Sequence, residues 1–368
     1  MGAIWLLALC NPIVAINGVL AGSLMGREQF RLVALGNTFA NSGLLLFPLA
    51  VAFVFSTDLF WLIAASMSAR IVGGIIIGVG VWRSILHGHP VRFERHEFRR
   101  LANFGVWVMV SALVGPLMLF ADRFLIGALY GAVAVAAYAI PYQIAVRTML
   151  LPNSITSALF PRFAAEQDKA ARERCAQFVA MIGLIFAPVI IGLVCLAGPL
   201  LALWLGSAFD PRSVAVAHWV LIGCWFNAIA LVPFSFLQAR GHPRFTAMLH
   251  LAELPIFVVL LLTLGSRYGL AGFAAAFALR CAGDWAALMV RAAMAKRAAL
   301  MPLLAPAMLI ASSMCAAALW DHWFALLAAA TFLELLSLAA IMMQMPDALR
   351  KPLMKLPIAG AVLARVWN

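Results

Sequence analysis

The sequence predicts an all-α polytopic membrane protein with about eleven membrane-spanning helices. The first observation is composition: 65% of the residues are hydrophobic and 11% are charged, whereas a soluble domain has roughly 45–50% apolar and 25% charged residues. The second is that the apolar residues lie in uninterrupted runs of about 20, the length at which a helix crosses hydrocarbon with its own backbone hydrogen bonds satisfied. The third is that alternating segments of about 10 residues, typical of a membrane β-barrel, do not occur. Lipid is therefore expected to surround most of the chain.

Each apolar run is long enough for one crossing, and a few polar or small residues separate it from the next. The first run begins almost at Met1 without a basic leader, so we read it as a retained helix. The fifth is long and partly polar, as is typical of a helix that faces a bundle interior. The predicted spans are 3–23, 33–55, 60–82, 104–126, 132–160, 178–203, 213–237, 247–265, 269–290, 303–321 and 323–344.

Loop charges predict the orientation. The first, third, fifth, seventh and ninth loops and the C-terminal tail together carry twenty Lys and Arg residues, whereas the alternate loops carry only Arg212 and Arg267. Because basic loops stay in the cytoplasm, the C-terminus is expected inside and, with eleven spans, the N-terminus outside. The net charge of +12 is then explained by anionic membrane lipids, and no nucleic-acid partner is expected.

A short internal sequence repeat predicts how the spans are grouped. Gly26 and Phe30 follow the first span as Gly241 and Phe245 follow the seventh. This fits two parallel lobes and implies that the first lobe lacks three N-terminal helices. The predicted organisation is a partial N-lobe (1–82), a basic inter-lobe loop (83–103), a C-lobe (104–300), two accessory helices (301–345) and a basic cytoplasmic tail (346–368).

Metal and cofactor chemistry is not expected. His87, His89 and His96 lie in the basic loop, but no second ligand cluster accompanies them, so a phospholipid-facing linker is the better interpretation. The six cysteines form no CxxC pair and read as small core residues, without a disulfide or zinc site. We predict no cofactor and no metal.

Ionisable side chains at membrane depth are costly and usually face a cavity or a partner. Arg280 and Asp284 are four residues apart, so an intrahelical pair is the simplest interpretation. Arg147, one turn after Gln143 and Tyr142, either lines a cavity or pairs with Asp122 or Glu253. The candidate substrate-binding residues are Arg147, Arg123, Asp122, Arg280, Arg70, Gln143 and Tyr142, with Asp284 and Glu253 as charge partners.

Arginine at depth favours an anionic cargo such as phosphate or pyrophosphate, because the guanidinium binds phosphate oxygens in a bidentate manner and keeps its charge when desolvated. The run from Gly73 to Gly78 reads as a close helix contact rather than a ligand loop. The sequence has no Walker-type phosphate loop, no HExxH and no GxSxG. These observations favour transport without an ATPase, and no enzyme activity is expected.

Two segments carry a family resemblance: ADRFLIG at 121–127 and LPNSITSALFPRFA at 151–164. They resemble two helices of the polysaccharide (O-antigen, Wzx-type) flippases, in the multidrug/oligosaccharidyl-lipid/polysaccharide exporter superfamily. The resemblance implies a two-lobed bundle in the bacterial inner membrane that works by alternating access. It also implies a partner set of polyprenyl-pyrophosphate-linked glycan, membrane lipids and other polysaccharide assembly proteins. The alternatives are a small-molecule exporter of the same superfamily, an inactive truncated flippase, and a membrane enzyme acting on polyprenyl-linked sugars.

Overall fold

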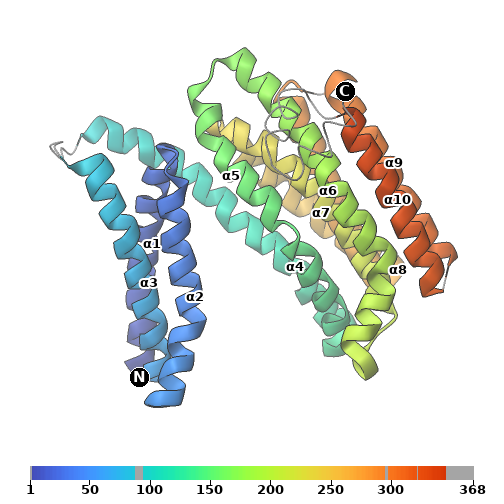
Figure 1. Cartoon of the computed structure of the whole chain (residues 1–368), viewed down its shortest axis with the longest axis horizontal. Helices are drawn as coiled ribbons and strands as arrows, with labels where there is room; N and C mark the ends of the chain where they lie inside the picture. The colour runs from blue at the N-terminus through green and yellow to red at the C-terminus, as the bar shows by residue number, and fades with distance from the viewer. Residues whose placement is uncertain (1, 88–93, 295–296, 321, 345–368) are drawn as a thin grey trace, which may run out of the picture. The chain divides into compact units, whose positions relative to one another are not determined.

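The computed structural model describes residues 2–87, 94–294, 297–320 and 322–344, and these fold as helices joined by short turns (Figure 1). Eight of the described helices are long and apolar enough to cross a membrane. The all-α membrane fold is therefore confirmed. The chain divides into two compact units, residues 1–98 and 99–368. The tail prediction (346–368) and His89 of the basic loop lie outside the described residues.

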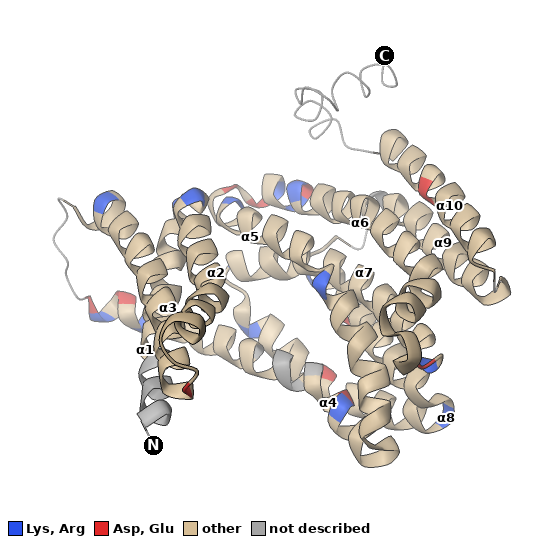
Figure 2. Cartoon of the chain, turned by 60° about the horizontal axis from the view of Figure 1, so that its bottom comes forward, with Lys and Arg blue, Asp and Glu red and all other residues tan. Residues whose placement is uncertain are grey.

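The first unit is a three-helix bundle of α1 (Gly2–Gly26), α2 (Phe30–Val54) and α3 (Leu59–Val81), followed by a π-helical turn η1 (Trp82–Leu86). The guanidinium of Arg27 donates a hydrogen bond to the carbonyl of Ser84 at 2.5 Å. The α1–α2 turn and the end of α3 therefore lie at the same end of this unit, and Figure 2 shows basic residues there.

Small residues bring α2 and α3 together. A Cβ atom built at Gly73 would lie 2.7 Å from the carbonyl oxygen of Gly36 and 2.7 Å from the Cβ of Ala40. Such distances leave no room for a methyl group, so the two backbones pack directly on each other. The interpretation of this run as a close helix contact therefore holds at Gly73.

Gly73→Ala should therefore destabilise the first unit by about 1–3 kcal/mol, as overpacking a tight contact generally does. Gly78→Ala is the matched control, because a Cβ there would meet only Leu20, at the ordinary contact distance of 3.8 Å. Thermal unfolding in detergent measures the difference, and equal midpoints for the two variants would rule out the close contact.

The second unit contains the remaining long helices, apart from the start of the first of them, which belongs to the first unit up to Phe98. They are α4 (Arg95–Arg147), α5 (Leu150–Ala165), α6 (Asp168–Leu205), α7 (Arg212–Ala239), α8 (Pro243–Arg291), α9 (Arg297–Leu319) and α10 (Trp323–Gln344). A short 3-10 turn, η2 (Gly206–Ala208), follows α6. Helix α7 packs between α6 and α8, and the accessory pair α9 and α10 packs on α6.

Two of these helices are hairpins of two helices each, broken at a glycine. Gly131 (φ 79°) interrupts α4, and Gly269 (φ 59°) interrupts α8. Glycine adopts these left-handed angles without the steric cost that a side chain would bring. The break in α8 separates the predicted spans 247–265 and 269–290.

The fifth predicted span (132–160) is divided between the end of α4 and α5. Helix α4 ends at Arg147, and α5 begins at Leu150 with Pro152 in its first turn. The N–H groups of Thr148 and Met149 bond to carbonyls three residues back, so the chain turns where proline cannot continue the backbone ladder.

The turns after α1 and α7 share one capping geometry. The N–H of Glu28 bonds to Met25 O and that of Gln29 to Leu24 O, while Gly241 bonds to Gln238 O and His242 to Leu237 O. The residue at positive φ is Glu28 (58°) in the first turn and Gly241 (79°) in the second. The two turns are thus equivalent. The structure aligns Gly241 with Glu28, however, whereas the sequence repeat aligned Gly241 with Gly26, so the predicted alignment is wrong by two residues.

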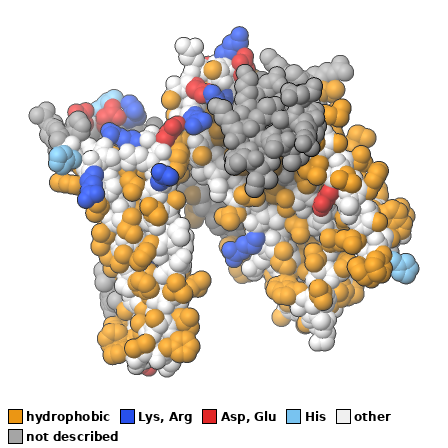
Figure 3. All heavy atoms as spheres, in the orientation of Figure 1, with side chains coloured by type: hydrophobic (Ala, Val, Ile, Leu, Met, Phe, Trp, Pro, Cys, Tyr) orange, Lys and Arg blue, Asp and Glu red, His pale blue; other side chains and the backbone are white. Residues whose placement is uncertain are grey.

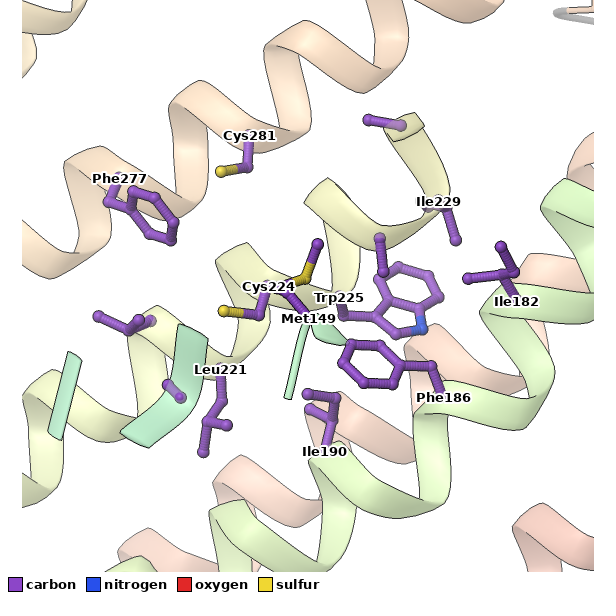
Figure 4. Packing of buried hydrophobic residues seen from close by; sticks show 14 of the residues in the cluster. Met149, Ile182, Phe186, Ile190, Leu221, Cys224, Trp225, Ile229, Phe277 and Cys281 are labelled. Atoms are coloured by element: carbon purple, nitrogen blue, oxygen red, sulfur yellow. The ribbon is translucent and has the colours of Figure 1, made fainter. Parts of the chain in front are cut away.

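The core of the second unit lies between α6, α7 and α8. Trp225 of α7 donates its indole N–H to the carbonyl of Gly183 of α6 at 3.0 Å. Across the α7–α8 interface lie Cys224, Phe277 and Cys281 (Figure 4). The expectation that cysteines serve as small core residues holds for Cys175, Cys195, Cys224 and Cys281, which are buried, and is wrong for Cys315, which is exposed. The outward surface is apolar: Figure 3 shows hydrophobic side chains over much of the visible face of each unit, with Leu203 85% exposed.

Basic side chains from several turns gather at one end of the second unit. Arg172 at the start of α6 donates to the carbonyl of Ala292 after α8 at 2.9 Å, and Arg240 after α7 donates to the carbonyl of Glu166 at 3.0 Å. Arg240 also pairs with Asp168. The α5–α6 turn, the α7–α8 turn and the end of α8 are therefore held at the same end, which is the arrangement that the loop charges required.

Candidate functional site

The α8 hairpin brings ionisable side chains together inside the second unit. Its first half carries His250 and Glu253, and its second half carries Arg280 and Asp284. Glu253 and Asp284 lie at almost the same distance in sequence on either side of Gly269. Folding at the glycine therefore brings Glu253 of the first half against Arg280 of the second half.

The hairpin charges form a buried cluster. Arg280 Nη1 lies 3.8 Å from Glu253 Oε2, and each side chain is only 12% exposed. The guanidinium carbon lies 5.6 Å from the centroid of Phe257 and 5.5 Å from that of Phe277, so aromatic faces supply part of its solvation. The sequence suggested a pair of Arg280 with Asp284 along one helix; the closest ion pair is instead with Glu253, across the hairpin.

A second polar group forms at the α4 hairpin. Asp122 is 1% exposed and accepts a hydrogen bond of 2.6 Å from the Tyr138 hydroxyl and one of 2.7 Å from the Arg123 backbone N–H. The Arg123 guanidinium lies 4.5 Å from the centroid of Tyr142. Arg123 therefore contacts an aromatic ring inside this unit.

These two groups are neighbours. The Tyr142 and Phe277 rings pack edge to face with centroids 5.3 Å apart, and an Arg280 nitrogen lies 4.0 Å from Met118 Sδ. Tyr142 is 3% exposed, and its hydroxyl has no hydrogen-bond partner among the described residues. Six candidate residues therefore share one buried neighbourhood: Asp122, Arg123, Tyr142, Glu253, Arg280 and Asp284.

Arg147 and Gln143 lie apart from this neighbourhood. Both are exposed and one helical turn apart at the end of α4. Asp122 is bonded to Tyr138 and Glu253 is paired with Arg280. Within the described parts of the chain, the Arg147 guanidinium has no hydrogen bond or ion pair with these or other residues. Arg70, a half-buried residue of α3, belongs to the other unit.

Sequence reasoning missed two members of the site. Tyr138 is the partner of Asp122, and His250, stacked on Phe234 with centroids 5.6 Å apart, lies next to Asp284. His250 lies three residues before Glu253, so helical spacing could have placed both on one face. Among the described residues no group of three His, Cys, Asp or Glu side chains could hold a metal ion.

Comparison with known proteins identifies the family. The sequence profile of polysaccharide biosynthesis proteins matches residues 3–214, more than half of the chain. The chain belongs to this family. The match ends within α7, so it covers the first unit and the α4 hairpin but not the α8 cluster.

A curated relative and a solved structure agree with this assignment. A putative O-antigen transporter of Shigella flexneri is 32% identical over 276 residues, 75% of this chain. The chain thus spans slightly less than two thirds of that relative, 66% of its length. The crystal structure of a mutant of a Vibrio cholerae MATE transporter superposes with a TM-score of 0.62 over 81% of this chain and 69% of that one, at 16% identity. The predicted resemblance to the flippase family and the MATE-like fold are confirmed.

Proposed function

We propose that this chain moves undecaprenyl-pyrophosphate-linked oligosaccharide across the bacterial inner membrane, from the cytoplasmic to the periplasmic leaflet, by alternating access. The basic end of the second unit would face the cytoplasm, as the loop charges predict. The family assignment and the similarity to an O-antigen transporter support a polysaccharide role. The MATE-like fold supports transport rather than catalysis.

The substrate assignment rests on Arg147, which is exposed and has no partner among the described residues. Arginines and acids occur in equal number at membrane depth, namely Arg70, Arg123, Arg147 and Arg280 against Asp122, Glu253, Asp284 and Glu334. The numbers of basic and acidic residues at membrane depth therefore give no excess of positive charge. A local excess arises because Asp122 and Glu253 are engaged in the buried neighbourhood, whereas Arg147 is exposed and unpaired among the described residues.

An unpaired guanidinium at this depth suits a pyrophosphate. Its planar fork donates two parallel hydrogen bonds to phosphate oxygens, and its charge persists in a site of low water content. The exposed amide of Gln143, one turn away, can donate to the same group or to the first sugar. The polyprenyl tail would remain in lipid against the apolar outer surface.

Complementation tests this function. Expressed in a strain that lacks its polysaccharide flippase but makes the cognate lipid-linked glycan, the protein should restore surface polysaccharide. A small-molecule exporter of the same fold is the second candidate, favoured by the Vibrio cholerae structure. Rescue of drug sensitivity without any return of surface polysaccharide would support that candidate and reject ours.

A further inference from the structure

The charges of the α8 cluster do not balance. Glu253 and Asp284 are acids, and Arg280 is the guanidinium that faces them. With both carboxyl groups ionised and the His250 imidazole neutral, the cluster would carry one net negative charge. Asp284 is only 7% exposed, and an uncompensated charge at such a place is costly.

The position of the two acids around Arg280 shows where a balancing proton can reside. Glu253 Oε2 lies 3.8 Å from Arg280 Nη1 across the hairpin, and Asp284 follows Arg280 by one helical turn on the same helix face. As ionised groups they lack donors: both Glu253 oxygens and Oδ1 of Asp284 are buried without a hydrogen-bond partner among the described residues. A carboxylate oxygen only accepts hydrogen bonds, so two acids around one guanidinium are better satisfied when one of them carries a proton.

We propose that Glu253 and Asp284 share one proton and that this pair is the proton-exchange site of the transporter. In the protonated cluster the O–H of one carboxyl donates to an oxygen of the other, and the remaining negative charge is balanced by Arg280. Loss of the proton to water leaves two carboxylates facing one guanidinium. The site thus has two states that differ by one charge.

His250 is the competing position for the proton. An imidazolium has two N–H donors, yet Nδ1 of His250 is buried without a partner among the described residues. Its ring lies flat against Phe234, with an interplanar angle of 10°. The other titratable groups facing the cluster are the thiols of Cys224 and Cys281 and the Tyr142 hydroxyl from α4, whose ordinary forms are neutral at pH 7. The carboxyl pair is therefore the better site.

Infrared spectroscopy of the full-length protein in lipid at pH 7 tests the assignment. A protonated carboxyl group has a carbonyl stretch separate from the bands of carboxylates. We expect this band in the wild type, its loss in the double variant E253Q/D284N, and its retention in E334Q, which removes another acid at membrane depth. Absence of the band from the wild type would place the balancing charge elsewhere, and its persistence in the double variant would assign it to other groups; either result overturns the proposal.

The exchange role rests on the proposed function and needs its own measurement. In proteoliposomes containing polyprenyl-pyrophosphate-linked oligosaccharide, wild-type transport should change with an imposed pH gradient. E253Q and D284N should transport at rates that do not respond to the gradient. Gradient dependence equal to that of the wild type in both variants would overturn the exchange role. If the wild type moves no glycan at all, the proposed function fails, whereas the infrared result still decides whether the pair holds a proton.

Discussion

Replacing Arg280 with leucine should lower the free energy of unfolding of the second unit by about 3–5 kcal/mol, the cost of removing one partner of a buried ion pair. Arg280 is the guanidinium that faces both Glu253 and Asp284, and only 12% of its side chain is exposed. Without it, two adjacent carboxyl groups remain in an apolar interior. Each must then be protonated or remain uncompensated, and both outcomes weaken the cluster.

Thermal unfolding in detergent measures this loss. Arg267→Leu is the matched control, because Arg267 lies exposed near the turn of the same hairpin and its loss should change little. Adding Glu253→Gln to Arg280→Leu should recover part of the stability, since a single buried carboxyl becomes neutral by holding one proton. If Arg280→Leu unfolds at the same temperature as the Arg267 control, the cluster does not stabilise the unit.

Arg147→Ala should abolish restoration of surface polysaccharide while leaving expression and thermal stability unchanged. The Arg147 side chain is exposed and makes no ion pair among the described residues, so its removal breaks no internal contact. A pyrophosphate, in contrast, would lose a bidentate, charge-assisted partner. Arg147→Lys should restore part of the activity, because an ammonium keeps the charge but not the fork.

The readout for Arg147 is the amount of surface polysaccharide at equal protein level. Arg267→Ala controls for the removal of one positive charge, since Arg267 lies in an exposed turn. Full restoration by Arg147→Ala would exclude Arg147 from substrate binding. Loss of expression or stability would instead show that the residue has a structural partner.

Composition and local chemistry predicted most of the fold. The last span was predicted at 323–344, which are the bounds of α10, because Trp323 and Phe324 begin an apolar run where polar residues end. The helix breaks were also predictable at Gly269, where two runs meet, and before Pro152. The extension of α6 back to Asp168 was missed, because its first turns are polar and carry no membrane signal.

The candidate site was only partly predictable, because its pairings depend on how hairpins fold. Arg280 and Asp284 share a helix face in sequence, yet the closest ion pair of Arg280 lies across the hairpin, at Glu253. Asp122 was predicted as a charged position, but its bond with Tyr138 depends on the turn at Gly131. Helical periodicity orders residues along one helix and does not fix the register between two. His250 was missed for the same reason.

Movement of the glycan by the purified protein is the direct test of the proposed transport function. Polyprenyl-pyrophosphate-linked oligosaccharide is placed in both leaflets of proteoliposomes, and a membrane-impermeant glycosidase is added outside. We predict that the wild-type protein exposes the inner-leaflet glycan to the enzyme, so that nearly all of it is cleaved. Cleavage that stops at the outer leaflet, as in protein-free liposomes, with correctly folded protein in the membrane, would contradict the account.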